Sequence, residues 1–161
     1  MLPQIYGDWV EAQLREVKLK PELQEQAERH AKNARSVNRR MTETVSRLAE
    51  DADAQAAFRL ANRAILLQRQ WSFPDEDDLV WRPFQLGFML LTMSAIICDD
   101  SDEKAVRERE IVDLLWFPTG GGKTEAYLGL IAFTLFFRRL KLGDTGAGVS
   151  ALMRYTLRLL T

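Results

Sequence analysis

The sequence contains little cysteine and little histidine, and its charges nearly cancel. The single cysteine, Cys98, cannot form an intramolecular disulfide, so we expect a buried side chain in a protein of the reducing cytoplasm. The lone histidine, His30, lies in a helical pattern without further metal ligands nearby, which argues against a histidine-based metal site. A net charge of −1 gives no overall preference for nucleic acid.

Long apolar runs and a secretion signal are also missing. The longest apolar stretch, Leu86–Cys98, is too short to cross a membrane and includes Thr92 and Ser94. The first ten residues lack the basic and apolar regions of a signal peptide, so we expect no membrane partner. With 161 residues and 47% hydrophobic side chains, the chain can nevertheless bury a core.

The most informative stretch is the glycine-rich sequence Pro118-Thr-Gly-Gly-Gly-Lys-Thr124, which predicts a phosphate-binding loop of the P-loop (Walker A) kind. Glycine backbone N–H groups can approach phosphate closely, Lys123 can reach the outer phosphates, and the Thr124 hydroxyl can bind a metal ion. The ligands expected are ATP and Mg²⁺. The residues predicted to bind the nucleotide here are Thr119, Gly120, Gly121, Gly122, Lys123 and Thr124.

The loop departs from the strict pattern, because Phe117 stands where the first glycine belongs. The alternative is a glycine-rich strand-to-helix turn with a chance Lys-Thr pair. The helix expected over 124–140 favours the phosphate-binding interpretation, since its positive end points at the same anion.

The first 72 residues predict a helical region. Apolar residues at spacings of three and four predict helices over 4–18, 22–50 and 54–70, and the acidic break at 50–53 supplies an N-cap for the third. Arg35, Arg39 and Arg40 are interpreted as part of a solvated face, with contact to nucleic acid as the alternative.

The remainder, residues 73–161, predicts an α/β arrangement. Pro83 should begin a buried helix that ends near Cys98, and 99–110 should form a surface loop or an irregular insertion. The apolar segments 111–117 and 149–153 predict parallel strands joined through helix 124–140, with a further helix over 155–160. Asp113 interrupts the first strand and should be exposed or paired.

Gln85 is a polar residue on this expected buried helix, so it needs a hydrogen-bond partner. Its amide matches the donor and acceptor edge of adenine, and its position ahead of the phosphate loop favours adenine recognition. The alternative is a glutamine that caps local backbone.

Three of these segments resemble superfamily 2 helicases, namely Trp81-Arg-Pro-Phe-Gln85, the phosphate loop and 153–161. The resemblance implies that residues 73–161 are the first part of a RecA-like P-loop ATPase domain, truncated after motif Ia. It also implies that Gln85 reads adenine, with Arg82 beside the base. The residues that take the place of the DNA-contacting motif Ia are Arg154, Thr156 and Arg158.

Longer phrases at 57–64, 84–88, 113–130 and 152–161 resemble the large helicase of the DISARM anti-phage system. This resemblance implies a bacterial cytoplasmic protein that couples ATP hydrolysis to movement on DNA and works with other defence components.

Hydrolysis by such a motor needs an Asp-Glu pair at the end of a later strand. After Thr124 the only acidic residues are Glu125 and Asp144, and neither ends an apolar strand. We therefore expect the chain alone to bind ATP without hydrolysing it. Two alternatives stay open: a P-loop ATPase unrelated to DNA, and a non-catalytic helical interaction module with a vestigial loop.

Overall fold

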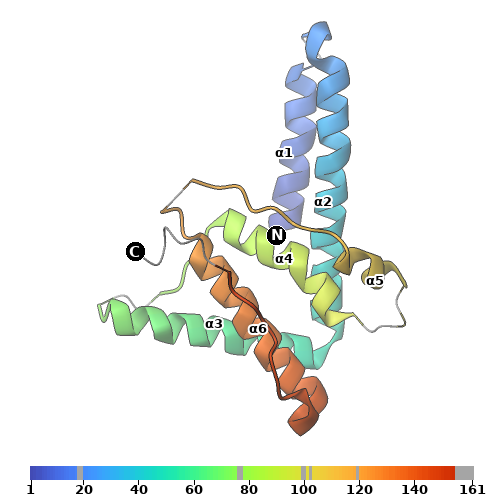
Figure 1. Cartoon of the computed structure of the whole chain (residues 1–161). Helices are drawn as coiled ribbons and strands as arrows, with labels where there is room; N and C mark the ends of the chain where they lie inside the picture. The colour runs from blue at the N-terminus through green and yellow to red at the C-terminus, as the bar shows by residue number, and fades with distance from the viewer. Residues whose placement is uncertain (18–19, 76–77, 99–100, 102, 119, 155–161) are drawn as a thin grey trace.

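The computed structural model describes the chain except for residues 18–19, 76–77, 99–100, 102, 119 and 155–161. Within the described residues all regular structure is helical (Figure 1). The α-helices are α1 (Leu2–Val17), α2 (Gln24–Glu50), α3 (Ala52–Ser72), α4 (Pro83–Ile97), α5 (Glu103–Arg109) and α6 (Lys123–Leu142). Short 3-10 turns, η1 (Pro21–Leu23) and η2 (Gly143–Gly146), precede α2 and follow α6.

The predicted α/β fold with a RecA-like parallel sheet is wrong, because the described part of the chain contains no strand. Segments 111–117 and 149–153 run in extended form without pairing to each other or to another described segment. An apolar run is compatible with a buried strand, but only a partner that supplies backbone hydrogen bonds makes it one. Here α6 packs on α3 and α4.

The helices themselves follow the sequence closely. Those expected over 4–18, 22–50, 54–70 and 124–140 are all present, and α4 begins at Pro83 as predicted. The expected loop at 99–110 instead contains α5, a short helix whose charged sequence gives no apolar periodicity. The helix expected over 155–160 lies outside the described residues.

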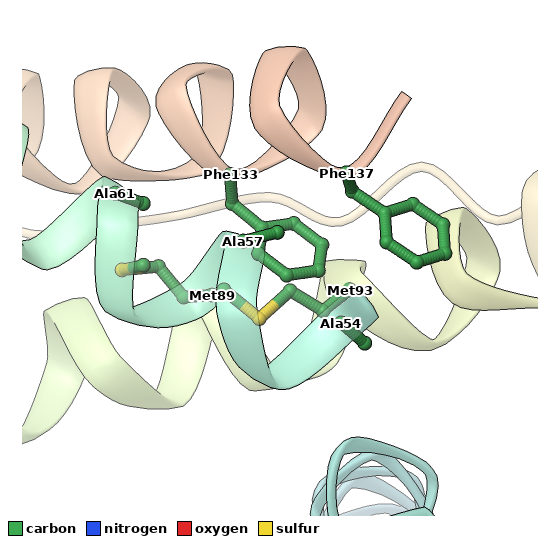
Figure 2. Packing of buried hydrophobic residues seen from close by; sticks show 7 residues of the cluster. All are labelled: Ala54, Ala57, Ala61, Met89, Met93, Phe133 and Phe137. Atoms are coloured by element: carbon green, nitrogen blue, oxygen red, sulfur yellow. The ribbon is translucent and has the colours of Figure 1, made fainter. Parts of the chain in front are cut away.

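The core forms where α3, α4 and α6 meet (Figure 2). Three alanines at spacings of three and four give α3 a narrow, smooth stripe, which allows close approach. Two phenylalanines of α6 and two methionines of α4, each pair four residues apart in sequence, pack against this stripe. Their large side chains fill the space that the alanines leave. The fully or nearly fully buried residues are Ala54, Ala57, Ala61, Met89, Met93, Phe133 and Phe137. Helices from both sides of residue 72 therefore share one core.

Helices α1 and α2 lie side by side and project from this core (Figure 1). Val10 and Ala31 are buried in the hairpin, and Arg35 of α2 pairs with Glu11 of α1 at 2.8 Å. Arg39 pairs with Glu43 on its own helix, also at 2.8 Å. Both arginines are exposed, in accord with a solvated face, and such exposed pairs stabilise little.

Arg40, by contrast, is buried and fixes the extended segment 111–117 to the helices. Its two terminal nitrogens each donate to a carboxylate oxygen of Asp113 at 2.8 Å, and one also donates to the carbonyl of Leu91 at 3.1 Å. The hydrogen bond to Asp113 raises the pKa of Arg40 against the opposing effect of burial. The prediction that Asp113 is exposed or paired is confirmed, because Asp113 forms a bidentate ion pair with Arg40.

Asp51 joins the start of α3 to the end of α6. One of its oxygens caps α3 by accepting from the backbone N–H groups of Asp53 and Ala54, at 2.9 and 3.0 Å. The other lies 3.0 Å from Nζ of Lys141 in α6. The acidic N-cap was predicted from the sequence, whereas the partner on α6 was not.

Candidate functional site

The predicted phosphate loop lies directly before α6, whose N-cap is Gly122. No side chain among the described residues caps this helix end. The N–H groups of a first helical turn have no partner within the helix, and they carry the positive end of its dipole. The end of a 20-residue helix therefore offers backbone donors to an anion.

Two of the loop glycines are required by their surroundings. At Gly122 φ is +89°, and an added Cβ would lie 2.7 Å from Nε2 of Gln85. At Gly121 an added Cβ would lie 2.4 Å from the ring of Phe117. The positive φ at Gly122, and the Phe117 ring and Pro118 carbonyl beside Gly121, therefore disfavour a side chain at these positions.

Lys123 is the first residue of α6, and its ammonium group turns back over the loop. Nζ donates to the carbonyl oxygens of Phe117 at 2.6 Å and of Pro118 at 3.1 Å. These two acceptors occupy two of the three ammonium N–H donors, and because they are neutral carbonyls they do not offset the charge. The lysine charge is therefore held at the loop, where a phosphate could serve as its counterion.

The N-terminus of α4 also holds the loop. The Gln85 side chain accepts from the backbone N–H of Arg82 at 2.8 Å and donates to the carbonyl of Gly122 at 2.7 Å. Nη1 of Arg82 donates to the carbonyl of Gly121 at 2.9 Å. Gln85 thus makes the local backbone cap that was the alternative to adenine recognition, and adenine contact stays a prediction.

Aromatic contacts support the same junction. Phe84 of α4 stacks on Phe117, with ring centroids 3.8 Å apart. One turn further along α4, Phe88 meets Tyr127 of α6 edge-to-face at 5.4 Å. The loop is thereby clamped between α4 and α6, and its geometry depends on both helices.

A cavity of about 1190 Å³ opens beside the loop. It brings together most of the residues singled out in the sequence: Arg82, Gln85, Gly120, Gly122, Lys123, Thr124 and Arg154. Gly121 contributes through its carbonyl and does not line the cavity. Thr119, Thr156 and Arg158 lie outside the described residues.

The lining contributed by the described residues has an excess of positive charge. Among these residues, Arg69, Arg82, Lys123 and Arg154 line the cavity, against one carboxylate, that of Glu125. Such a balance favours an anionic ligand. Within the described chain, no group of three or more His, Cys, Asp or Glu side chains is placed to hold a metal ion. A magnesium ion here would therefore depend on Thr124 and on oxygens of the ligand itself.

Sequence reasoning missed the contribution of α3 to this cavity. Arg69 belongs to no phosphate-binding motif, and Trp81 was noted only as part of the segment before Gln85. A usable signal was the seven-residue spacing of Asn62 and Arg69, which places both on one face of α3. The packing of α3 against α6 is what places Arg69 at the cavity beside the loop.

The fold and site define a helical chain with a glycine-rich loop at the start of α6. No protein-family model matches the chain. It is similar to the DISARM protein DrmA of Bacillus paralicheniformis, with 47% identity over 114 residues. The match covers 68% of this chain and 10% of that protein, so the chain is related to a DISARM protein of which it spans about a tenth. Across the described residues, no helix has both the length and the apolarity to cross a membrane.

Proposed function

We propose that this chain is the ATP-binding segment of a DISARM anti-phage defence protein. The observation that carries the proposal is the convergence of the α6 N-terminus, Lys123, Arg82 and Gln85 on one cavity with excess positive charge. Those residues come from two separate stretches of sequence. A glycine-rich turn that served only to connect two segments would need neither the lysine nor the cationic lining.

In the proposed complex the phosphates lie at the start of α6. Backbone N–H groups of the first turn donate to phosphate oxygens, and Lys123 exchanges the carbonyls of Phe117 and Pro118 for the outer phosphates. The Thr124 hydroxyl binds Mg²⁺ together with phosphate oxygens. The base then lies toward Arg82 and Gln85, where the resemblance to helicases puts adenine.

The proposal extends to the whole protein on the strength of the helicase resemblance and the DISARM relative. That protein would use ATP hydrolysis to move on DNA together with other defence components, and Arg154 would be one DNA-backbone contact. Hydrolysis by the whole protein that rises on addition of DNA would support this part. Hydrolysis unaffected by DNA would leave a P-loop ATPase without a DNA role.

The direct test is calorimetric titration of the 161-residue chain with ATP and Mg²⁺. We expect Lys123→Ala to weaken ATP binding by at least about tenfold, because charge-assisted hydrogen bonds to phosphate are lost. Lys32→Ala is the matched control, since Lys32 is an exposed lysine of α2 that does not line the cavity. Equal ATP affinity in the Lys123 variant and the unaltered chain would refute the phosphate-binding role.

A further inference from the structure

Arg69 of α3 lies outside every motif, yet it lines the cavity that contains Gly120, Lys123 and Thr124. We propose that Arg69 is a phosphate contact of the nucleotide site. The inference rests on the proposed ATP-binding function and adds one residue to it. It would make the N-terminal helical region part of the site, and not merely its support.

The position of Arg69 follows from the way α3 meets α6. Trp81 lies between the two helices: its Nε1 donates to Oδ1 of Asn62 in α3 at 2.6 Å. On the other side its ring borders Gly129 of α6, where an added Cβ would lie 2.9 Å from Trp81. Trp81 thereby fixes the register between the helices on this side of the cavity.

Arg69 follows Asn62 by seven residues, which is two turns of the same helix face. Ile65, one turn after Asn62, is buried on that face. Two turns carry the chain about 10 Å along the helix axis. Arg69 therefore lies two turns beyond the Trp81 contact, at the end of this face where α3 reaches the cavity.

The local setting suits a phosphate-binding guanidinium. Arg69 lies over the ring of Phe73, with its central carbon 5.9 Å from the ring centroid. A guanidinium is planar by resonance, and its fork of N–H donors binds phosphate oxygens in pairs; contact with an aromatic ring restricts how that plane is oriented. Lysine cannot reproduce this geometry, because its ammonium is a point charge.

Arg69 adds a cation to the cavity from a third helix. Among the described residues, Lys123 and Thr124 of α6 and Arg82 next to α4 line the same cavity, and Arg69 lines it from α3. A triphosphate carries more negative charge than one lysine can neutralise, so a second cation on the α3 side lowers the electrostatic cost of binding it.

The test measures the affinity of Arg69→Gln for two probes, ATP with Mg²⁺ and inorganic tripolyphosphate. We expect both to bind roughly tenfold more weakly than to the unaltered chain, since bidentate phosphate contacts are charge-assisted. Arg69→Lys should recover only part of the loss. Arg63→Gln is the matched control, because Arg63 is an exposed arginine of α3 that does not line the cavity. Circular dichroism of each variant establishes that the helices are intact.

The outcomes separate the two proposals. If Lys123→Ala loses ATP while Arg69→Gln binds both probes normally, the Arg69 inference is overturned and the ATP site stands. A loss of ATP without a loss of tripolyphosphate would place Arg69 at the nucleoside and would also overturn the inference. If the unaltered chain binds neither probe, the proposed function fails and the Arg69 contact fails with it.

Discussion

Two regions of this molecule contain similar apolar residues but differ in how far those side chains are buried. In the α3–α4–α6 core, Phe133 and the facing alanines are completely buried. In the extended segment before the loop, Val112, Leu114 and Trp116 are 92, 85 and 89% exposed. Segment 149–153 resembles the second case, with Leu152 and Val149 largely exposed.

The contrast shows what burial requires beyond hydrophobicity. A helix satisfies its own backbone hydrogen bonds, so α3, α4 and α6 need only complementary side chains to pack. An extended segment forms no backbone hydrogen bonds within itself, so individual contacts with the helices hold it in place. Segment 111–117 is held at Asp113 and at the Phe117 ring, and the glycine-rich loop lies between that anchored segment and α6.

The largest effect should come from a cavity in the core. Phe133→Ala removes a fully buried ring that stacks on Phe137 with centroids 5.7 Å apart, so we expect a loss of about 3–5 kcal/mol in the free energy of unfolding. Chemical denaturation measures it. Leu135→Ala on the same helix is half exposed and should change stability by less than about 0.5 kcal/mol. Equal losses in the two variants would contradict the assignment of the core.

The anchor of the extended segment should come next. Arg40→Met leaves the Asp113 carboxylate without its bidentate partner, and we expect a loss of about 3 kcal/mol in the free energy of unfolding. The double variant Arg40→Met, Asp113→Leu should recover most of that loss, since an apolar pair carries no desolvation penalty. Denaturation curves of both variants provide the comparison, with Arg39→Ala as the exposed control. An Arg40 variant as stable as the Arg39 control would show that the pair does not anchor the segment.

The smallest effect should be found at the α3 cap. Burial tends to raise the pKa of Asp51, but hydrogen bonds from the backbone of Ala54, from Lys141 and from the backbone of Asp53 lower it overall. A lowered folded-state pKa gives stability that is present above the unfolded value of about 3.9 and is lost as pH falls through the folded value. Asp51→Ala should therefore cost about 1 kcal/mol at pH 7, and this difference should shrink in strong acid.

Asp51→Asn separates the cap from the charge. Asparagine caps helices about as well as aspartate but offers no charge to Lys141, so its cost at pH 7 should be smaller than that of alanine. Thermal unfolding between pH 2 and pH 7 measures both variants. A difference between Asp51→Ala and the unaltered chain that persists in full at pH 2 would contradict the lowered pKa.

The sequence predicted the helices better than the fold. Spacings of three and four, the acidic cap before α3 and Pro83 at the start of α4 are local signals, and local signals suffice for helices. The strands at 111–117 and 149–153 were predicted from apolar runs, and pairing depends on a distant partner that such a run does not reveal. The Arg40–Asp113 pair joins residues 73 positions apart, beyond the reach of any local pattern.

The same distinction applies to the candidate site. The loop from Gly120 to Thr124 and the residues Arg82 and Gln85 were identifiable because each belongs to a short motif. Their convergence depends on α4 packing against α6. Arg69 was not identifiable, because it reaches the cavity only through the packing of α3.

The most direct measurement is the amide NMR spectrum of the isotope-labelled chain during addition of ATP and Mg²⁺. Phosphate binding at the start of α6 predicts that the largest shifts fall on the amides of Gly120 to Thr124, with smaller shifts at Arg82 and Gln85. The core amides of α3 around Ala57 should move little. An unchanged spectrum at millimolar ATP, or shifts confined to α1 and α2, would contradict the account.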